Sequence, residues 1–444
     1  METAEQTLPT EALSRKQQVL HGAFFWLCAF YFVYCARPGD WIPGLSHLPL
    51  AKITGIGAFL SLLSSLGKTK RKFSDLPRES HYLLGMIIVL FLSGLVSPVW
   101  AGGAVSHVLD FCKVYVAWVL TFMLLTSFDR FHRIIFIQSA SVAVICTVSI
   151  IKGHGSDRLE GVIGGIYSNP NDLAFAVVLS LPFCLAFLIS AKKALVKVVW
   201  LGSILIMLMA LVMTASRGGF VTLVVAGAVC LWHFGVRGKR FFLIVGTAVV
   251  GAVILIAAGD KLIDRFEAMS GETVEGRAAA YESYEQRKYL MQRAIEGIEE
   301  HPLFGVGARN FAVYSGVWRD VHMTFLQIAV EGGIPAAILF LLFFKRSFSN
   351  LKMLLKRKDL DTNMVLFVGA LHSSMVGFIV GALFAPEAYQ FFPYFAVAYT
   401  SALVAIVREQ DRVAEPALPE PATKQENVYI YRPQGPKTPV GAVR

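Results

Sequence analysis

The feature that most constrains the fold is a series of apolar runs long enough to cross a bilayer. A helix needs about 20 apolar residues to span the hydrocarbon core of a membrane. A helix also satisfies its backbone hydrogen bonds within the segment, as lipid demands. The chain of 444 residues holds about twelve such runs. They lie at about residues 20–36, 49–66, 82–98, 107–126, 132–151, 171–189, 195–213, 218–234, 240–259, 322–343, 363–384 and 388–407. We therefore predict an all-α fold, a polytopic membrane bundle of about twelve transmembrane helices.

Composition agrees with this prediction and excludes two classes of protein. Hydrophobic residues make up 55% of the chain and charged residues 16%, whereas soluble proteins carry about a quarter charged residues. An ordinary cytosolic enzyme and a disordered protein are therefore excluded. The net charge of +10 would suggest nucleic-acid binding in a soluble chain. Here the basic residues gather in loops between spans, which is the usual pattern of cytoplasmic loops, so we expect no nucleic-acid partner.

The distribution of Lys and Arg predicts the orientation of the bundle. With the N-terminus in the cytoplasm, the inner loops carry most of the basic residues, at 68–78, 130–133, 192–197, 237–240 and 345–358. The outer loops between neighbouring spans carry only Arg37, Lys152, Arg158 and Arg217. Cytoplasmic loops are enriched in Lys and Arg, so both termini are expected in the cytoplasm.

The same reading divides the chain into five parts. A cytoplasmic N-terminal segment is followed by nine spans, a large external loop with helices of its own, three further spans and a disordered cytoplasmic tail rich in proline. The boundaries are 1–19, 20–259, 260–321, 322–407 and 408–444.

An arginine at the outer surface is informative because the positive-inside rule disfavours it. Arg217 lies in the motif SRGG, in a turn so short that it barely separates two spans. A guanidinium there suits a phosphate or diphosphate, which it can bind with two parallel hydrogen bonds. The alternative is an arginine that reaches the lipid headgroups. The sequence does not decide between the two.

The external loop holds an amphipathic helix, expected at about 283–300 and ended by Pro302. Its apolar stripe should comprise Leu290, Met291, Ala294, Ile295 and Ile298. Arg287 falls near the centre of this stripe, whereas Arg293 falls on the opposite face and should point to water. Because a buried charge is costly unless paired, Arg287 should face either a protein carboxylate or a ligand phosphate.

Two further polar residues lie at the external ends of spans, and a third, Glu331, lies deeper in the tenth span. His322 is placed where a neutral imidazole could serve as a general base, although a lone interfacial histidine is more often an anchor. Asn171, in YSNPNDLAF, is expected to cap the sixth span, and a ligand role for it is open. Glu331, followed by Gly332, Gly333 and Pro335, is expected to be structural in a broken or closely packed helix. The outer regions show no DxD, HExxH or clustered His and Cys, so neither a metal nor another cofactor is expected.

These motifs, in this order, resemble the O-antigen ligase and polymerase family of bacterial envelope glycan enzymes. The resemblance rests on SRGG after a span, on Arg287 fifteen residues before Pro302 in HPLFGVG, and on His322 opening a span that continues to Glu331. It covers about residues 165–345, together with the NPND element.

The resemblance implies a metal-independent, inverting glycosyltransferase at the outer face of the cytoplasmic membrane. Its donor would be a polyprenyl-diphosphate-linked glycan. Arg217 and Arg287, with Asn171, would bind the donor, and His322 would orient or deprotonate the acceptor hydroxyl. The acceptor would be a lipid A core in a ligase, a growing glycan in a polymerase, or a protein hydroxyl. A lipid-linked glycan transporter is the remaining alternative. It would require more polar residues within the spans than the chain carries.

Overall fold

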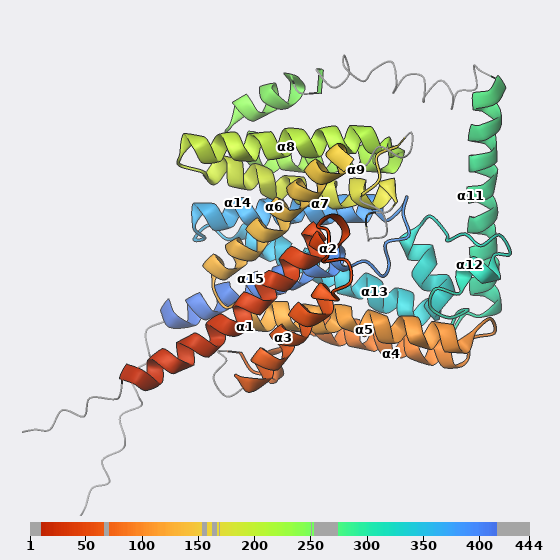
Figure 1. Cartoon of the computed structure of the whole chain (residues 1–444), viewed down its shortest axis with the longest axis horizontal. Helices are drawn as coiled ribbons and strands as arrows, with labels where there is room; N and C mark the ends of the chain where they lie inside the picture. The colour runs from red at the N-terminus through yellow and green to blue at the C-terminus, as the bar shows by residue number, and fades with distance from the viewer. Residues whose placement is uncertain are drawn as a thin grey trace, which may run out of the picture. The chain divides into compact units, whose positions relative to one another are not determined.

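The computed structural model describes residues 10–65, 71–152, 158–161, 167, 169–249, 251–252 and 274–414. Over these residues the chain is helical, with short turns of 3-10 and π helix and no strand, which confirms the predicted fold class (Figure 1). The chain divides into two compact units, Met1–Ile406 and Val407–Arg444. All the apolar helices begin in the first unit.

Nine helical segments in the described part of the chain are long and apolar enough to cross a membrane. They belong to α4 (Arg78–Leu95), α5 (Ala101–Leu124), α6 (Phe128–Lys152), α7 (Pro170–Ser190), α8 (Ala194–Thr214), α9 (Arg217–Cys230) with the π-helical η3 (Leu231–Val236), α13 (Thr324–Lys356), α14 (Thr362–Gly381) and α15 (Phe391–Ala414). Each coincides with a predicted span.

Three predicted spans are represented less completely. The first two correspond to shorter apolar helices, His21–Ala36 within α1 (Thr10–Ala36) and Leu50–Ser64, which is α3. The span predicted at 240–259 is helical over 241–249 and 251–252, and the rest of it lies outside the described residues. The count of twelve therefore stays a prediction, as do the boundaries of the external loop and of the tail.

The centre of the bundle is formed by α7, α14 and α15, whose most apolar windows are 72%, 72% and 83% buried. By contrast, the corresponding window of α8 is 22% buried, so most of its apolar surface is left to face lipid. α7 packs against α8, α9 and α14, and α13 packs along α4. The element that lies across the bundle is α11 (Val274–Glu300), which contacts α13 (Figure 1).

The helix α13 extends beyond the predicted span of 322–343 and ends at Lys356. Hydropathy detects where a helix leaves the lipid, but not where it stops being helical. Beyond Phe344, one face of α13 stays buried through Ser347, Leu351 and Leu354. Asn350 on this face donates a hydrogen bond to buried Glu79 of α4. Packing against α4 therefore extends the helix.

The predicted break near Glu331 is confirmed, because Gly333 has φ 76° and ψ 176° inside α13. The backbone of the preceding loop bonds to this break. Val306 N–H donates to Val330 O at 2.8 Å, and Gly307 N–H donates to Glu331 O at 3.0 Å. A Cβ on Gly333 would lie 2.4 Å from Leu303 O. Glycine is therefore required by the contact as well as by the backbone angle.

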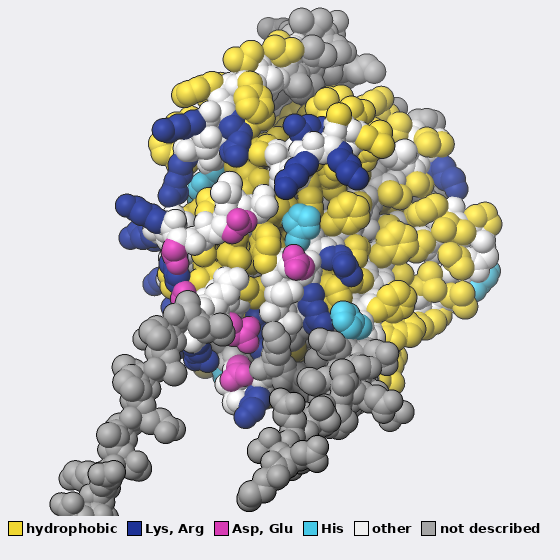
Figure 2. Space-filling model, turned by 90° about the vertical axis from the view of Figure 1, so that its left-hand side faces the viewer, with side chains coloured by type: hydrophobic (Ala, Val, Ile, Leu, Met, Phe, Trp, Pro, Cys, Tyr) yellow, Lys and Arg dark blue, Asp and Glu magenta, His cyan; other side chains and the backbone are white. Residues whose placement is uncertain are grey.

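Figure 2 shows one end of the bundle, where Lys and Arg side chains are prominent over the apolar surface. Two of the predicted inner loops, at 237–240 and 345–358, lie beside each other. α6 begins with Arg130 and Arg133, and Arg237 after η3 donates a hydrogen bond to Leu355 O near the end of α13. This agrees with the predicted sorting of charge between the two ends, while the side of the membrane that each end faces stays a prediction.

Candidate anion-binding site

The SRGG motif forms the tight turn between α8 and α9. α8 ends at Thr214 and α9 begins at Arg217. Ser216 caps α9, because its Oγ accepts the N–H of Gly219 at 3.1 Å. A Cβ on Gly219 would lie 2.9 Å from the Cβ of Ala174 in α7, so glycine lets the two helices approach closely. Arg217 is thus held in the first turn of a helix, where the dipole and the unpaired N–H groups favour an anion.

The start of α7 lies beside this turn, but its cap differs from the prediction. Asn169, not Asn171, is the N-cap, and its Oδ1 accepts the N–H of Asn171 at 2.9 Å. Pro170 then occupies the first helical position, which it favours. The side chain of Asn171 is therefore released from capping. Its Oδ1 accepts a hydrogen bond from Arg158 Nη2 at 3.2 Å.

α11 brings Arg287 to the same place. Leu290 and Ala294 are buried in a cluster with Val306 and Phe311, and Ile298 packs against it. Met291 and Ile295 are 44% and 47% exposed, so the buried stripe is narrower than predicted. Arg287 lies on the helix face of Leu290 and Ala294, one turn before Leu290, as expected.

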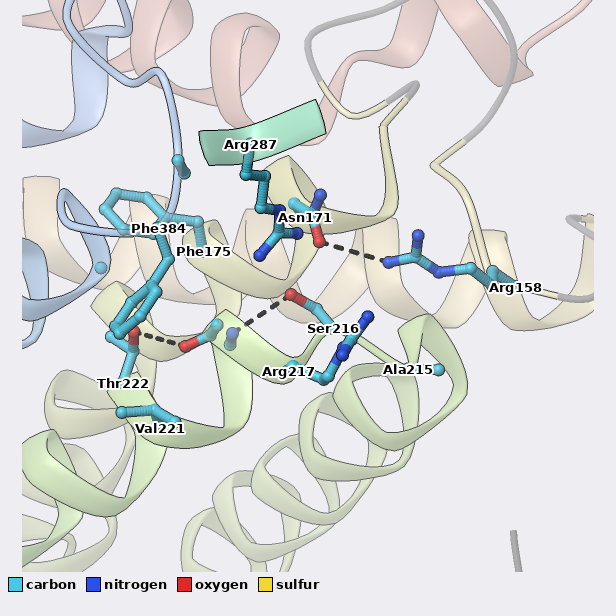
Figure 3. A pocket seen from close by; sticks show the side chains of 14 residues that line it. Arg158, Asn171, Phe175, Ala215, Ser216, Arg217, Val221, Thr222, Arg287 and Phe384 are labelled. Carbon is cyan, nitrogen blue, oxygen red and sulfur yellow. Dashed lines mark hydrogen bonds between the residues drawn. The ribbon is translucent and has the colours of Figure 1, made fainter. Parts of the chain in front are cut away.

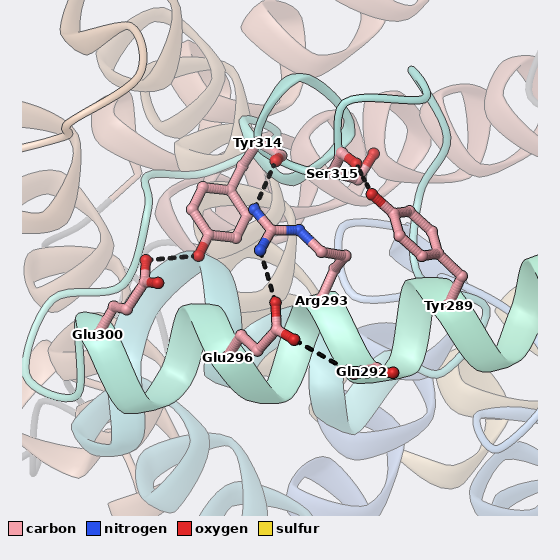
Figure 4. Close-up of polar contacts among 7 residues, drawn as sticks. All are labelled: Tyr289, Gln292, Arg293, Glu296, Glu300, Tyr314 and Ser315. Carbon is pink, nitrogen blue, oxygen red and sulfur yellow. Dashed lines mark hydrogen bonds and ion pairs between the residues drawn. The ribbon is translucent and has the colours of Figure 1, made fainter.

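Arg293 does not simply point to water, as the sequence suggested. Its guanidinium donates to Glu296 at 2.5 Å and to Tyr314 O at 3.3 Å, and it lies 4.6 Å from the centre of the Tyr314 ring (Figure 4). The Tyr314 hydroxyl donates to Glu300, and the Tyr289 hydroxyl donates to Ser315 O. The prediction failed because α12 (Phe311–Tyr314) covers this side of α11. These contacts fix α11, and with it Arg287.

These three segments, together with Arg158 and residues 381–385 at the end of α14, line a cavity of about 300 Å³. Arg158, Arg217 and Arg287 lie around it (Figure 3). Among the described residues, its lining includes no Asp or Glu. The lining residues are Arg158, Asn171, Phe175, Ala215, Ser216, Arg217, Gly218, Gly219, Val221, Thr222, Arg287, Gly381, Phe384 and Ala385.

Two of the three guanidinium groups at this pocket, those of Arg217 and Arg287, are not balanced by any carboxylate in the described part of the chain. Arg158 donates to Thr214 O at 2.9 Å as well as to Asn171, which points its guanidinium along the pocket wall. Within the described part of the chain, neither Arg217 nor Arg287 has a side-chain hydrogen bond or an ion pair. Partial burial lowers the pKa of Arg287, and the charge of Arg217 lowers it further. The two guanidinium groups are thus close enough to repel, and a bound anion would relieve that repulsion.

His322 does not line this pocket, but it lies within electrostatic reach of it. Burial lowers the pKa of His322, and the positive charge of Arg287 adds to the effect. The imidazole is therefore neutral at pH 7. Its Nδ1 lies 3.0 Å from Asp320 O. Because a carbonyl oxygen only accepts, Nδ1 carries the proton in this bond, and Nε2 keeps the lone pair that a general base needs.

The structure brings the two predicted arginines and Asn171 into one pocket and leaves His322 beside it. Sequence reasoning missed Arg158, Phe384 and Ala385 as parts of this site. The signal for Arg158 was present, since it is one of the few basic residues in the outer loops. Phe384 and Ala385 lie in an apolar segment that carries no comparable signal.

Glu331 is placed as a structural residue, in line with its interpretation from sequence. One carboxylate oxygen accepts from the Tyr389 hydroxyl at 2.6 Å, and its backbone oxygen accepts from Ser93 at 2.7 Å. Among the described residues, no group of three or more His, Cys, Asp or Glu side chains is arranged to hold a metal ion.

Taken together, the bundle and the pocket define a multi-pass membrane protein with an arginine-lined pocket at the ends of several of its helices. Residues 202–341 match the family model described as O-antigen ligase, which confirms the resemblance expected from the motifs. The match runs from α8 to the first half of α13 and includes Arg217, Arg287 and His322. No curated protein matches the chain. The family match supports glycosyl transfer in the synthesis of envelope glycans.

Proposed function

We propose that the protein transfers a glycan from a polyprenyl diphosphate to an acceptor hydroxyl at the outer face of the bacterial inner membrane. The acceptor that we favour is a lipid A core, as in an O-antigen ligase. A polymerase acting on a growing glycan and a ligase acting on protein hydroxyls would use the same chemistry.

The observation that carries this proposal is the meeting of Arg217 and Arg287 in one pocket, whose lining, as far as the structure describes it, holds no carboxylate. Such a pocket suits a ligand with several negative oxygens, and a diphosphate has them. Arg217 and Arg287 supply donors that the protein leaves unused, and the first turn of α9 adds backbone N–H groups. Each charge-assisted hydrogen bond is worth ~1.5–3 kcal/mol. Arg158 and Asn171, which are hydrogen-bonded to each other, also line the pocket.

The proposed reaction follows from this charge distribution. The acceptor oxygen attacks the anomeric carbon, the bond from that carbon to the diphosphate oxygen breaks, and the configuration inverts. His322 Nε2 takes the proton of the attacking hydroxyl. The electron pair of the broken bond stays on the diphosphate, where Arg217 and Arg287 stabilise the growing charge. No step requires a metal ion.

The polyprenyl tail needs an apolar exit from the pocket. Val221 and Phe384 line the pocket, and their side chains are 47% and 39% exposed. We infer that the tail leaves the pocket along these residues toward lipid. Its diphosphate end would then lie at the membrane surface, next to α11.

The test is turnover by the purified full-length protein in lipid vesicles, with a polyprenyl-diphosphate-linked oligosaccharide as donor and a lipid A core as acceptor. Released polyprenyl diphosphate and the glycosylated acceptor are both measured. We expect Arg217→Ala, Arg287→Ala and His322→Ala to lose turnover. The matched control is Arg37→Ala, which removes another outer arginine that is already paired with Asp40 at 2.7 Å.

Each outcome separates one alternative. Longer lipid-linked chains in place of glycosylated lipid A core indicate a polymerase. An intact diphosphate bond with glycan moved across the vesicle membrane indicates a transporter and refutes the proposal. Full turnover by the arginine variants would show that Arg217 and Arg287 are surface anchors instead of donor ligands.

A further inference from the structure

A groove of about 430 Å³ lies on the outside of the bundle, between α1 and α6. One face of residues 25–32 in α1 forms one side of it, and one face of residues 136–144 in α6 forms the other. Among the described residues, none with a charged side chain lines this groove, and none lines both it and the arginine pocket. The groove is therefore a separate, apolar feature of the membrane-spanning part.

The shape of the groove suits a lipid chain. Ala29 and Ala140 leave space between the two helices, while Phe25, Phe32 and Phe136 stand beside them with 66%, 44% and 47% of their surface exposed. The lining segments rise about 10–12 Å along their helices. One leaflet contributes roughly half of the hydrocarbon core of about 30 Å. The groove therefore has the length for a segment of one acyl chain within a single leaflet.

Two contacts show that α1 and α6 run in the same direction. Close to the start of α6, the guanidinium of Arg130 lies 4.9 Å from the centre of the Phe24 ring. At the other end of α6, Lys152 Nζ donates to Trp41 O, shortly after the end of α1, at 2.8 Å. The two helices thus rise together from the end of the bundle where α6 begins (Figure 1). The headgroup of a lipid in the groove belongs at that end.

A cation without a partner lies between this end of the bundle and the groove. Arg133 precedes Phe136 by three residues, so the two side chains share a face of α6. Arg133 is exposed, and within the described part of the chain its side chain has no hydrogen bond or ion pair, not even with Asp129 one turn earlier. By contrast, Arg130 donates to a backbone carbonyl at the end of α5 at 3.0 Å. Arg133 is therefore the arginine that a ligand can reach.

We propose that the groove and Arg133 form a binding site for an anionic glycerophospholipid. One acyl chain lies in the groove, and the lipid phosphate accepts hydrogen bonds from the guanidinium of Arg133. Charge complementarity identifies this occupant, because an anionic leaflet attracts basic residues that lie at its surface. The bound lipid bridges α1 and α6 and holds α1 against the bundle. The site is independent of the glycan-transfer reaction, so either proposal can fail without the other.

The experiment is photocrosslinking of the full-length protein in phosphatidylcholine vesicles. The vesicles contain a trace of phosphatidylglycerol with a photoactivatable group in one acyl chain, and adducts are mapped by mass spectrometry. We expect adducts in residues 25–32 and 136–144 at several times the density found in residues 195–205 of α8, which expose apolar side chains outside the groove. Unlabelled phosphatidylglycerol should compete for these adducts, and added phosphatidylcholine should not.

Four variants separate charge from packing. Arg133→Gln should reduce the groove adducts about fivefold, the effect of one basic residue at an anionic leaflet. Arg133→Lys keeps the charge and should retain most adducts, whereas Ala140→Phe fills the groove and should lose them. The matched control is Lys352→Gln, which removes an exposed charge from α13, a helix packed on α4 and α14. Equal labelling of Arg133→Gln and wild type, or groove labelling no denser than that of α8, overturns the inference.

A second copy of the chain is the other occupant that such a groove would accept. Cys28 lines the groove as a free thiol, so oxidative crosslinking reports a neighbouring copy directly. Cys112→Ser removes the other partly exposed cysteine and serves as the background for this measurement. Dimers linked through Cys28, together with a groove that takes up no lipid label, would overturn the proposal. Lipid labelling of the groove without such dimers supports it.

Discussion

Replacing Arg217 with glutamine should weaken diphosphate binding without destabilising the free protein. Arg217 has no side-chain partner in the described part of the chain, so its removal breaks no hydrogen bond or ion pair there. Its charge lowers the pKa of Arg287, so its removal also relieves a repulsion. A residue with no partner of its own is instead available to a ligand.

The magnitude follows from the number of bonds that Arg217 offers. Two parallel charge-assisted hydrogen bonds would be worth ~3–6 kcal/mol if fully shielded from water. Arg217 is exposed in the free protein, so water competes and the lower part of the range applies. A loss of about 1.5–3 kcal/mol corresponds to roughly 10- to 150-fold weaker binding.

The assay is titration of farnesyl diphosphate into the purified protein at fixed salt, with the Tm of the ligand-free protein measured beside it. Arg37→Gln is the control, since its ion pair with Asp40 is worth at most about 1 kcal/mol at the surface. Equal affinity in Arg217→Gln and wild type would refute the role as a phosphate ligand. A large fall in the Tm of ligand-free Arg217→Gln would show that Arg217 stabilises the fold.

Three further predictions follow. The rate of transfer should fall as the pH drops through the lowered pKa of His322, below 6.5, because protonation removes the base. A profile of kcat/KM that stays flat down to the pH at which the protein unfolds would exclude His322 from this role. Gly333→Ala should lower the free energy of unfolding by about 2–4 kcal/mol. Gly316 has the same φ of 76° but no atom within 4 Å of an added Cβ, so Gly316→Ala should lower it by only about 1 kcal/mol. Equal Tm values for the two variants would contradict the contact with Leu303. Arg293→Ala should destabilise the packing of α11 by about 1 kcal/mol, because the contacts with Tyr314 and Glu296 are lost. The measurement is hydrogen exchange in residues 287–300, which should become faster. Unchanged exchange would show that the apolar cluster alone holds the helix.

The parts of the site that follow from sequence are those with a local signal. Arg217 stands out because it interrupts an apolar region on the side where arginine is rare, and Arg287 because helical periodicity assigns it a face. The same periodicity overestimated the width of the buried stripe, because it assigned Met291 and Ile295 to it. Periodicity gives the direction of a buried face but not the width of the surface that packs against it. Periodicity also predicted that Arg293 faces water, because it gives no sign that α12, which comes later in the chain, packs against this side of α11.

The parts that could not be predicted depend on contacts between distant segments. Phe384 and Ala385 are ordinary residues in a short connection until the fold places them in one pocket with Arg217 and Arg287. The cap of α7 was assigned to Asn171 because either asparagine of Asn169-Pro170-Asn171 can cap a helix, and only the preference of proline for the first helical position favours Asn169. The extension of α13 to Lys356 likewise depends on α4, through Glu79 and Asn350.

Because Arg217 lies in a short turn at the end of a lipid-facing helix, its position should depend on the surrounding lipid. Arg217–Val236 is 20 residues long and its most apolar window is 33% buried, so it is a largely lipid-facing rod of about 30 Å. Such helices adjust their tilt to the thickness of the bilayer. α11, which carries Arg287, is not among the apolar spans and need not follow that tilt. The separation of the two guanidinium groups, and hence the affinity for a diphosphate, should therefore vary with the chain length of the surrounding lipids.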